Sequence, residues 1–306
     1  MHKYLKYLLN AVLVILIAFA FLYFATRNIS SQQEWAVDSN GLLQYPSDRG
    51  KLEDVKVNLL EDNGTYTIEK TIFKSRDREI YGLLYMPKDA SNAPGIIILP
   101  AARAGKEGQD SLARKLVNRG YAFFTIDQRS IGETGGNVPA MQDDFNSFVA
   151  GNEPVQHLFV FDALRAFDFL KTKKGVDASK IFIGGESMGG RFAIIAAALD
   201  TRIAGVLVIS TSGFGMQNTV TQQDKFMASI NPDMYIGKIA PRRIVMFHSK
   251  NDTVIPFEQA QQTFSFAGNP KEFFIMPFPC DHGYCAESDR EFFEEMEEFS
   301  GRREEA

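Results

Sequence analysis

Short apolar runs alternate with amphipathic stretches through most of this 306-residue chain. Three early segments, at 53–59, 65–74 and 78–86, alternate apolar and polar side chains, as half-buried strands do. The run at 96–99 is instead uniformly apolar and follows Pro94 and Gly95, which is typical of a strand buried on both faces of a parallel sheet.

From residue 96 onward the pattern changes regularly between strand and helix. We predict strands at 121–126, 180–184, 204–209, 243–247 and 272–276, and helices at 107–119, 155–172, 192–199, from 257, and at 287–299. Repeated strand–helix–strand units imply a mostly parallel sheet with helices on both faces. An antiparallel beginning followed by this alternation suits the α/β-hydrolase fold.

The segment 211–240 interrupts this alternation and mixes large apolar residues with polar ones. We interpret it as a small cap over an active site, because long loops in compact domains are often functional. The alternative is an ordinary surface connection. The whole domain is expected to span 51–306.

The first residues carry a different signal. Residues 8–25 form an uncharged, mostly apolar run of 18, equivalent to about 27 Å of helix, close to the thickness of a bilayer core. We predict an N-terminal membrane anchor at 1–27, followed by a polar linker at 28–50. A cleaved signal peptide is the alternative, since Lys3 and Lys6 supply a basic leading segment. The same two lysines favour a cytoplasmic N-terminus and an extracytoplasmic domain.

Composition narrows the possible partners. The formal net charge is −5, and removing Lys3, Lys6 and Arg27 leaves 30 basic against 38 acidic residues, or −8. No basic run is interleaved with aromatic residues, so a nucleic-acid partner is not expected. The acidic pair at 143–144 and the acidic run at 291–298 are interpreted as solvated surface.

A five-residue motif, Gly185 to Gly189, carries the clearest chemistry. It follows the predicted strand at 180–184 and precedes an alanine-rich stretch at 192–199. This strand–turn–helix setting predicts a nucleophile elbow, in which Gly-x-Ser-x-Gly lifts a serine hydroxyl clear of the sheet. Ser187 is therefore the candidate nucleophile.

A serine hydroxyl needs a base to take its proton. Of the four histidines, His2 lies in the apolar leader, His157 in a predicted helix and His248 in an apolar strand. His282 follows the last predicted strand, at the sheet edge where α/β proteins collect their catalytic groups. We predict His282 as the base.

The acid that orients this imidazole should follow another strand end. Asp252 lies just beyond the strand at 243–247, which gives the chain order Ser, Asp, His with spacings of 65 and 30 residues. Asp281 is the rival, but a side chain adjacent in sequence usually points away from its neighbour. Asp252 is therefore the predicted acid.

The tetrahedral intermediate needs backbone N–H donors for its oxyanion. We predict the N–H of Met188, beside the nucleophile, and that of Ala102 in the loop after 96–99, with Ala101 in reserve because Pro100 has no N–H. Arg103 in this loop either steers an anionic substrate or is solvated.

No residue spacing favours a metal site. Cys280 and Cys285 bracket His282, and in an oxidising compartment they could form a disulfide. Two unpaired thiols remain the alternative.

From about 78 to 299 the sequence resembles the α/β-hydrolase superfamily, in its dienelactone-hydrolase-like and acetyl-esterase-like branch. The matching stretches are 162–166, 175–177, 185–189, 239–241, 251–252 and 281–283. The resemblance implies Ser187, Asp252 and His282 as a triad. It also implies hydrolysis of a carboxylic ester or related acyl bond in a small molecule, without a cofactor.

Three departures from that pattern matter. Pro100-Ala101 stands where many relatives carry His-Gly, and 127–130 lacks the glycine of a common Asp-x-Arg-Gly turn. Dienelactone hydrolases proper use a cysteine nucleophile, so Ser187 favours an esterase. The runner-up is a serine peptidase of the same fold, although the endopeptidases add a propeller domain for which this chain has no room. A non-catalytic binding protein is the third hypothesis.

Overall fold

The computed structural model describes residues 34–302. The chain divides into two units, residues 1–36 and 37–306, and the main sheet lies wholly within the second. The strands are β1 (Ala36–Val37), β2 (Leu43–Gln44), β3 (Lys56–Asp62), β4 (Tyr66–Ser75), β5 (Arg78–Pro87), β6 (Ala93–Leu99), β7 (Ala122–Ile126), β8 (Val176–Glu186), β9 (Val206–Ile209), β10 (Ile244–Ser249) and β11 (Lys271–Met276).

The helices alternate with these strands. The α-helices are α2 (Asp110–Val117), α3 (Met141–Val149), α4 (Val155–Lys171), α5 (Met188–Leu199), α6 (Gln222–Ser229), α7 (Phe257–Ser265) and α8 (Asp289–Ser300). The 3₁₀ helices are η1 (Lys106–Gln109), η2 (Pro232–Met234), η3 (Ile236–Lys238) and η4 (Ala286–Ser288).

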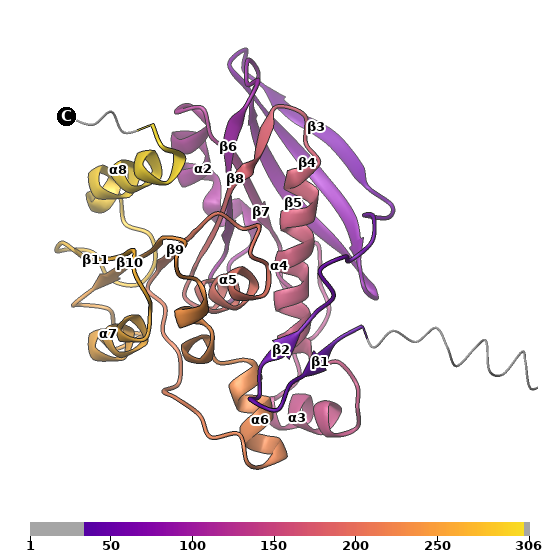
Figure 1. Cartoon of the computed structure of the whole chain (residues 1–306). Coiled ribbons are helices and arrows are strands. Elements are labelled where there is room, and N and C mark those ends of the chain that lie inside the picture. Colours follow the sequence, from indigo (N-terminus) through magenta and orange to yellow (C-terminus); the bar gives the residue numbers. More distant parts are fainter. Residues whose placement is uncertain (1–33, 303–306) are drawn as a thin grey trace, which may run out of the picture. The chain divides into compact units, whose positions relative to one another are not determined.

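Nine strands within residues 34–302 form one sheet in the order β11-β10-β9-β8-β6-β7-β5-β4-β3 (Figure 1). Neighbouring strands from β11 to β7 run parallel, whereas β5, β4 and β3 are antiparallel. The predicted strands are confirmed, and with them the antiparallel opening and parallel continuation of the α/β-hydrolase fold.

Helices cover both faces of this sheet. On one face, α2 and α8 pack through Leu116, Phe292 and Met296 into a cluster with alternate residues of the strands. On the other face, Phe159 of α4 stacks on Phe192 of α5, with 4.7 Å between ring centroids. Because both faces are covered, β6 and β7 are buried along their whole length, which explains why their sequences are apolar except at Thr125.

The predicted anchor at 8–25 lies outside the described residues. Within residues 34–302, no helix is both long and apolar enough to cross a membrane. The predicted linker at 28–50 is described from residue 34, and its second half packs on the domain. Leu43 is fully buried, and Arg49 pairs with Asp168 and Asp200 at 2.8 and 2.7 Å.

The interpretation of the acidic residues as solvated surface is wrong at two positions. Asp144 is only 2% exposed and accepts the N–H groups of Val155 and Gln156, the first residues of α4. The free N–H groups at the start of a helix attract a carboxylate. Here the carboxylate lies in the preceding helix, 11 residues before Val155, so the sequence did not reveal the contact. Glu295 is 4% exposed and forms an ion pair with Arg243 at 2.8 Å.

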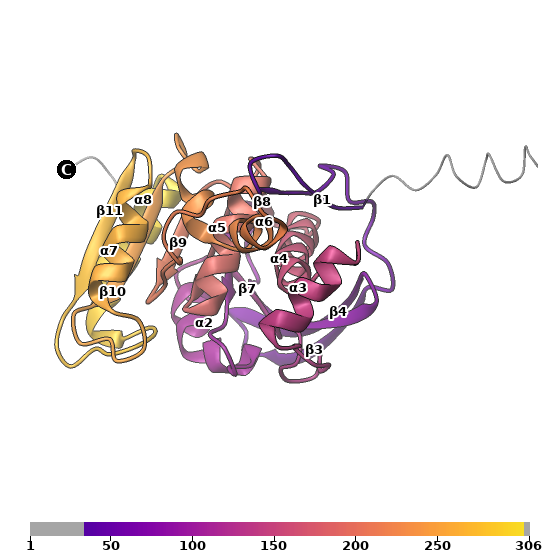
Figure 2. The same ribbon diagram turned by 90° about the horizontal axis from the view of Figure 1, so that it is seen from below.

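The segment 211–240, predicted as a cap, contains α6, η2 and η3. Helix α6 lies beside α3 (Figure 1, Figure 2). Helix α3 was not predicted from the sequence. Phe226 of α6 packs against Phe145 and Phe148 of α3, with ring centroids 5.7 and 5.6 Å apart. The two irregular segments therefore form one small helical layer.

His157 lies within this packing, and its burial is expected to make the stability of the protein depend on pH. The ring is fully buried, its Nε2 lies 2.7 Å from the hydroxyl of Ser229, and burial lowers its pKa to about 3. In the unfolded chain a histidine has a pKa near 6.5. Below that pH the unfolded state binds a proton at His157 whereas the folded state does not, so the free energy of unfolding decreases as the pH falls. At pH 5 we expect about 2 kcal/mol less stability from this group than at pH 7.

Urea unfolding at the two pH values checks this expectation. His157→Gln keeps a polar atom near Ser229 but cannot gain the proton, so its loss between pH 7 and pH 5 should be smaller by that amount. Equal losses in the two proteins would contradict the assignment.

Candidate active site

Ser187 stands on a sharp turn between β8 and α5. Its backbone has φ 51° and ψ −115°, a region that residues with a side chain rarely adopt. Its N–H donates to the carbonyl of Ile209 on the neighbouring strand, at 2.9 Å. Such strain persists only where the surrounding structure enforces it, and it is the geometry of a nucleophile elbow.

The two glycines of the motif make this turn possible. A Cβ on Gly185 would lie 2.5 Å from the carbonyl carbon of Gly189, and a Cβ on Gly189 would lie 2.2 Å from the carbonyl oxygen of Leu99. Both distances are far below van der Waals contact. Glycine is therefore required at both positions so that α5 can start tightly against β6.

His282 and Asp252 are brought together from separate strand ends. Asp252 follows β10, His282 follows β11, and Nδ1 of the imidazole lies 2.9 and 3.0 Å from the two carboxylate oxygens. The side chain of Asp252 is completely buried, whereas that of His282 is 20% exposed. A proton held on Nδ1 leaves Nε2 free as a proton acceptor.

The surroundings of Asp252 keep it ionised. Burial by itself would raise its pKa, but the N–H groups of Ile255 and Val254 and the His282 ring outweigh that effect, so the pKa lies below its usual value. Nε2 of His248 also lies 3.5 Å from the carboxylate. His248 is fully buried and its Nε2 donates to the carbonyl of Ile255 at 3.0 Å, as a packed core histidine does.

Asp281, the rival acid, is turned toward another partner. Its carboxylate accepts the N–H of Thr253 at 2.8 Å and the hydroxyl of the same residue. Asp281 bonds to Thr253 and Asp252 bonds to His282, so the two contacts hold the 252–253 turn against the 281–282 turn. Of the two acids, Asp252 is the one that contacts the imidazole.

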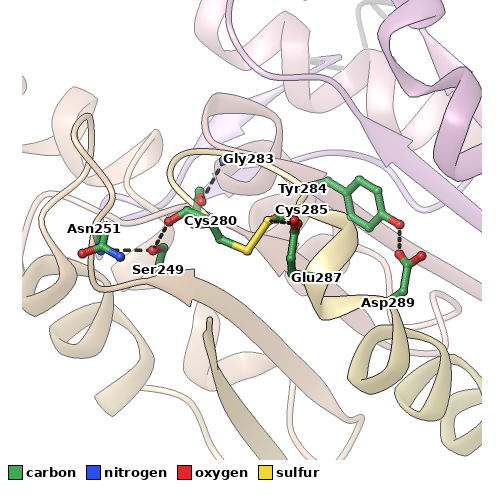
Figure 3. The surroundings of a disulfide bond; sticks show 9 residues. Ser249, Asn251, Cys280, Gly283, Tyr284, Cys285, Glu287 and Asp289 are labelled. Atoms are coloured by element: carbon green, nitrogen blue, oxygen red, sulfur yellow. Dashed lines mark hydrogen bonds between the residues drawn. A yellow bond between two sulfur atoms is a disulfide. The ribbon is translucent and has the colours of Figure 1, made fainter. Parts of the chain in front are cut away.

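A disulfide closes the loop that carries His282. Cys280 and Cys285, whose pairing the sequence left open, are bonded to each other (Figure 3). Figure 3 also shows the hydroxyl of Ser249 pointing to the carbonyl of Cys280, to which it donates at 2.6 Å. The same cysteines lie near Glu287 in a cluster of possible metal ligands, but bonded sulfurs offer no thiolate.

The nucleophile elbow and the histidine loop meet at the ends of β8 and β9. The N–H of Gly283 donates to the hydroxyl of Ser210 at 3.0 Å, one residue beyond the Ile209 carbonyl that holds Ser187. A carboxylate oxygen of Glu186 lies 3.4 Å from where a Cβ on Gly283 would stand. Within residues 34–302 the His282 ring bonds to Asp252 alone, through Nδ1, and its Nε2 has no hydrogen-bond partner there.

Glu186 itself was missed by the sequence analysis. Burial raises the pKa of its carboxyl group, an effect that the Gln109 side chain, the N–H of Tyr284 and the nearby His282 partly offset. The one feature of the sequence that could have indicated Glu186 is that an acidic residue ends an otherwise apolar stretch of β8.

The loop after β6 lies against the start of α5. Leu99 pairs with Gly185 across the sheet, and the Gln128 side chain donates to the carbonyl of Pro100. Neither Ala101 nor Ala102 uses its N–H in a hydrogen bond within the described residues, so both remain candidate oxyanion donors beside Met188. Arg103 is exposed and has a φ of 66°.

Comparison with known proteins assigns the chain to a family. The model of the dienelactone hydrolase family matches residues 80–304. An uncharacterized protein of Escherichia coli (strain K12), YfhR, is 24% identical over 195 residues, which cover 61% of this chain and 63% of YfhR. The putative hydrolase YtaP of Bacillus subtilis (strain 168) is 30% identical over 93 residues, 30% of each chain. The chain therefore matches less than two thirds of the length of these curated relatives.

Many solved structures share the fold, among them two esterases. An acetyl xylan esterase from Paenibacillus sp. R4 superposes with a TM-score of 0.70 at 19% identity, covering 82% of this chain and 90% of that one. A glucuronoyl esterase from Solibacter usitatus gives a TM-score of 0.60 at 15% identity, covering 85% and 88%. With the match over residues 80–304, the chain belongs to the dienelactone hydrolase family.

Proposed function

We propose that this protein is a serine hydrolase that cleaves a carboxylic ester, or a related acyl bond, in a small molecule. The observation that carries the proposal is the buried Asp252, bonded to the imidazole of His282, beside the strained turn of Ser187. The esterases among the structural neighbours support an ester in preference to an amide.

In the first half of the reaction, the Ser187 hydroxyl oxygen attacks the ester carbonyl while Nε2 of His282 takes its proton. The carbonyl oxygen becomes an oxyanion, which the N–H of Met188 and that of Ala101 or Ala102 stabilise. The imidazolium returns the proton to the departing alkoxide, an alcohol leaves, and the acyl group stays on Ser187.

In the second half, water replaces the alcohol. His282 takes a proton from the water as it attacks the acyl-enzyme, and Ser187 leaves with that proton restored. Asp252 stays ionised throughout, holds the imidazole in the required tautomer and stabilises its positive form. No cofactor takes part in this scheme.

A direct test offers the purified chain short-chain nitrophenyl esters and amino-acid anilides side by side, together with a fluorophosphonate probe. Ester turnover with labelling of Ser187 supports the proposal. Preference for anilides would favour a peptidase, and failure of both turnover and labelling would favour a binding protein.

A further inference from the structure

Three polar residues, Ser210, Thr211 and Ser212, follow directly after β9 and are fully buried. Their sequence matches no catalytic motif, and buried hydroxyl groups are costly unless they are bonded. Two of the three side chains bond to segments that carry the proposed catalytic residues.

Ser210 holds the histidine loop. Its hydroxyl accepts the N–H of Gly283, next to His282, at 3.0 Å, and its own N–H donates to the carbonyl of Phe247 on β10 at 2.9 Å. The backbone of Ser210 has a φ of 48°, a left-handed conformation that is unfavourable for a serine. Glycine would relieve that strain but would lack the hydroxyl.

Thr211 holds the nucleophile elbow. Its hydroxyl donates to the carbonyl of Ser187 at 2.7 Å, while the carbonyl of Ile209 accepts the N–H of Ser187 at 2.9 Å. The strained nucleophile is therefore held on both sides by one short segment. The Thr211 side chain also packs where a Cβ on Gly190 would stand, so it fixes the first turn of α5.

Ser212 completes the contact through its backbone. Its carbonyl accepts Nε of Arg191, on the first turn of α5, at 2.9 Å. The guanidinium of Arg191 lies over the ring of Phe214, 4.6 Å from its centroid. The helix that follows the nucleophile is thus tied to the same segment.

We propose that Ser210 and Thr211 are positioning residues, which set the distance between the Ser187 hydroxyl and the His282 imidazole by bonding to both segments at once. The inference rests on the proposed function. Its physical basis is that a displacement of about 1 Å in a reacting group can cost about 100-fold in rate.

Two substitutions test the two contacts. Ser210→Gly removes the acceptor for Gly283 and relieves the backbone strain, two changes that act on stability in opposite directions. Thr211→Val removes the donor to the Ser187 carbonyl at nearly constant volume. For each we expect kcat for a nitrophenyl ester to fall by about 10- to 100-fold with KM within about 3-fold. The rate of labelling by a fluorophosphonate should fall in parallel.

Two further variants serve as controls. Thr211→Ser keeps the hydroxyl and should restore most of kcat. Thr125→Val replaces another fully buried threonine, in β7, whose hydroxyl has no partner among the described residues, and it should leave kcat unchanged.

Values of kcat within about 3-fold of the wild type in both test variants would overturn the proposal. So would losses that only follow the folded fraction measured by thermal unfolding. A wild-type chain that neither turns over esters nor labels at Ser187 would instead refute the proposed function, so the two failures are distinguishable.

Discussion

Replacing Ser187 by alanine should lower kcat for ester hydrolysis by about 10⁴-fold or more. In the proposed mechanism the side chain removed is the one that forms the acyl-enzyme, and water attacking directly would have only the oxyanion donors and the binding energy to accelerate it. The fold should not change, because the strain at this position lies in the backbone, which alanine would share.

The measurement is steady-state turnover of a nitrophenyl ester, with unfolding followed in parallel. Ser179→Ala is a matched control on the same strand, since Ser179 is exposed near the start of β8 and its side chain bonds, among residues 34–302, only to Asp177. It should retain wild-type turnover. Turnover that persists in Ser187→Ala would mean that another group is the nucleophile.

Replacing Asp252 by asparagine should lower kcat by about 10⁴-fold while preserving the shape of the site. An amide can donate a hydrogen bond to Nδ1 of His282, which favours the tautomer with its proton on Nε2, the wrong one for a base. The pKa of Asp252 lies below its usual value, so the wild-type carboxylate is ionised throughout the neutral range. The loss should therefore be seen at every pH from about 6 to 8.

Asp281→Asn is the matched control for that experiment. Asp281 is adjacent to His282 in sequence, but its carboxylate accepts bonds from Thr253. We expect it to reduce kcat only by about 3-fold, through a less well held turn. A larger loss in Asp281→Asn than in Asp252→Asn would reverse the assignment of the acid.

The sequence predicted the main-sheet strands and most helices because their signals are local. Alternation at 65–74 and the uniform apolar run at 96–99 each report how many faces of a strand are buried, and the structure has β4 and β6 there. Helix α3 was not predicted because it is short and because polar residues in its first turn obscure the helical spacing of its apolar residues. Phe145 and Phe148 form the apolar face that packs against α6.

Several contacts could not be predicted from local pattern at all. Asp144 lies in α3, 11 residues before the start of the helix that it caps, and 73 residues separate Ser210 from Gly283. Nothing in a buried Ser-Thr-Ser run states which backbone groups it will meet. The bond between Ser210 and Gly283 exists only after β9, β10 and β11 have paired and brought their ends together.

By itself, the sequence determined the class of fold, the elbow glycines and the candidate residues Ser187, Asp252 and His282, because each depends on residue type and on nearby neighbours. Only the tertiary structure decided that Asp252 and not Asp281 meets the imidazole, that Cys280 and Cys285 are bonded, and that one segment after β9 contacts both halves of the site. The physical reason is that a parallel sheet gathers strand ends that are far apart along the chain, and their side-chain directions are set by packing across the whole domain.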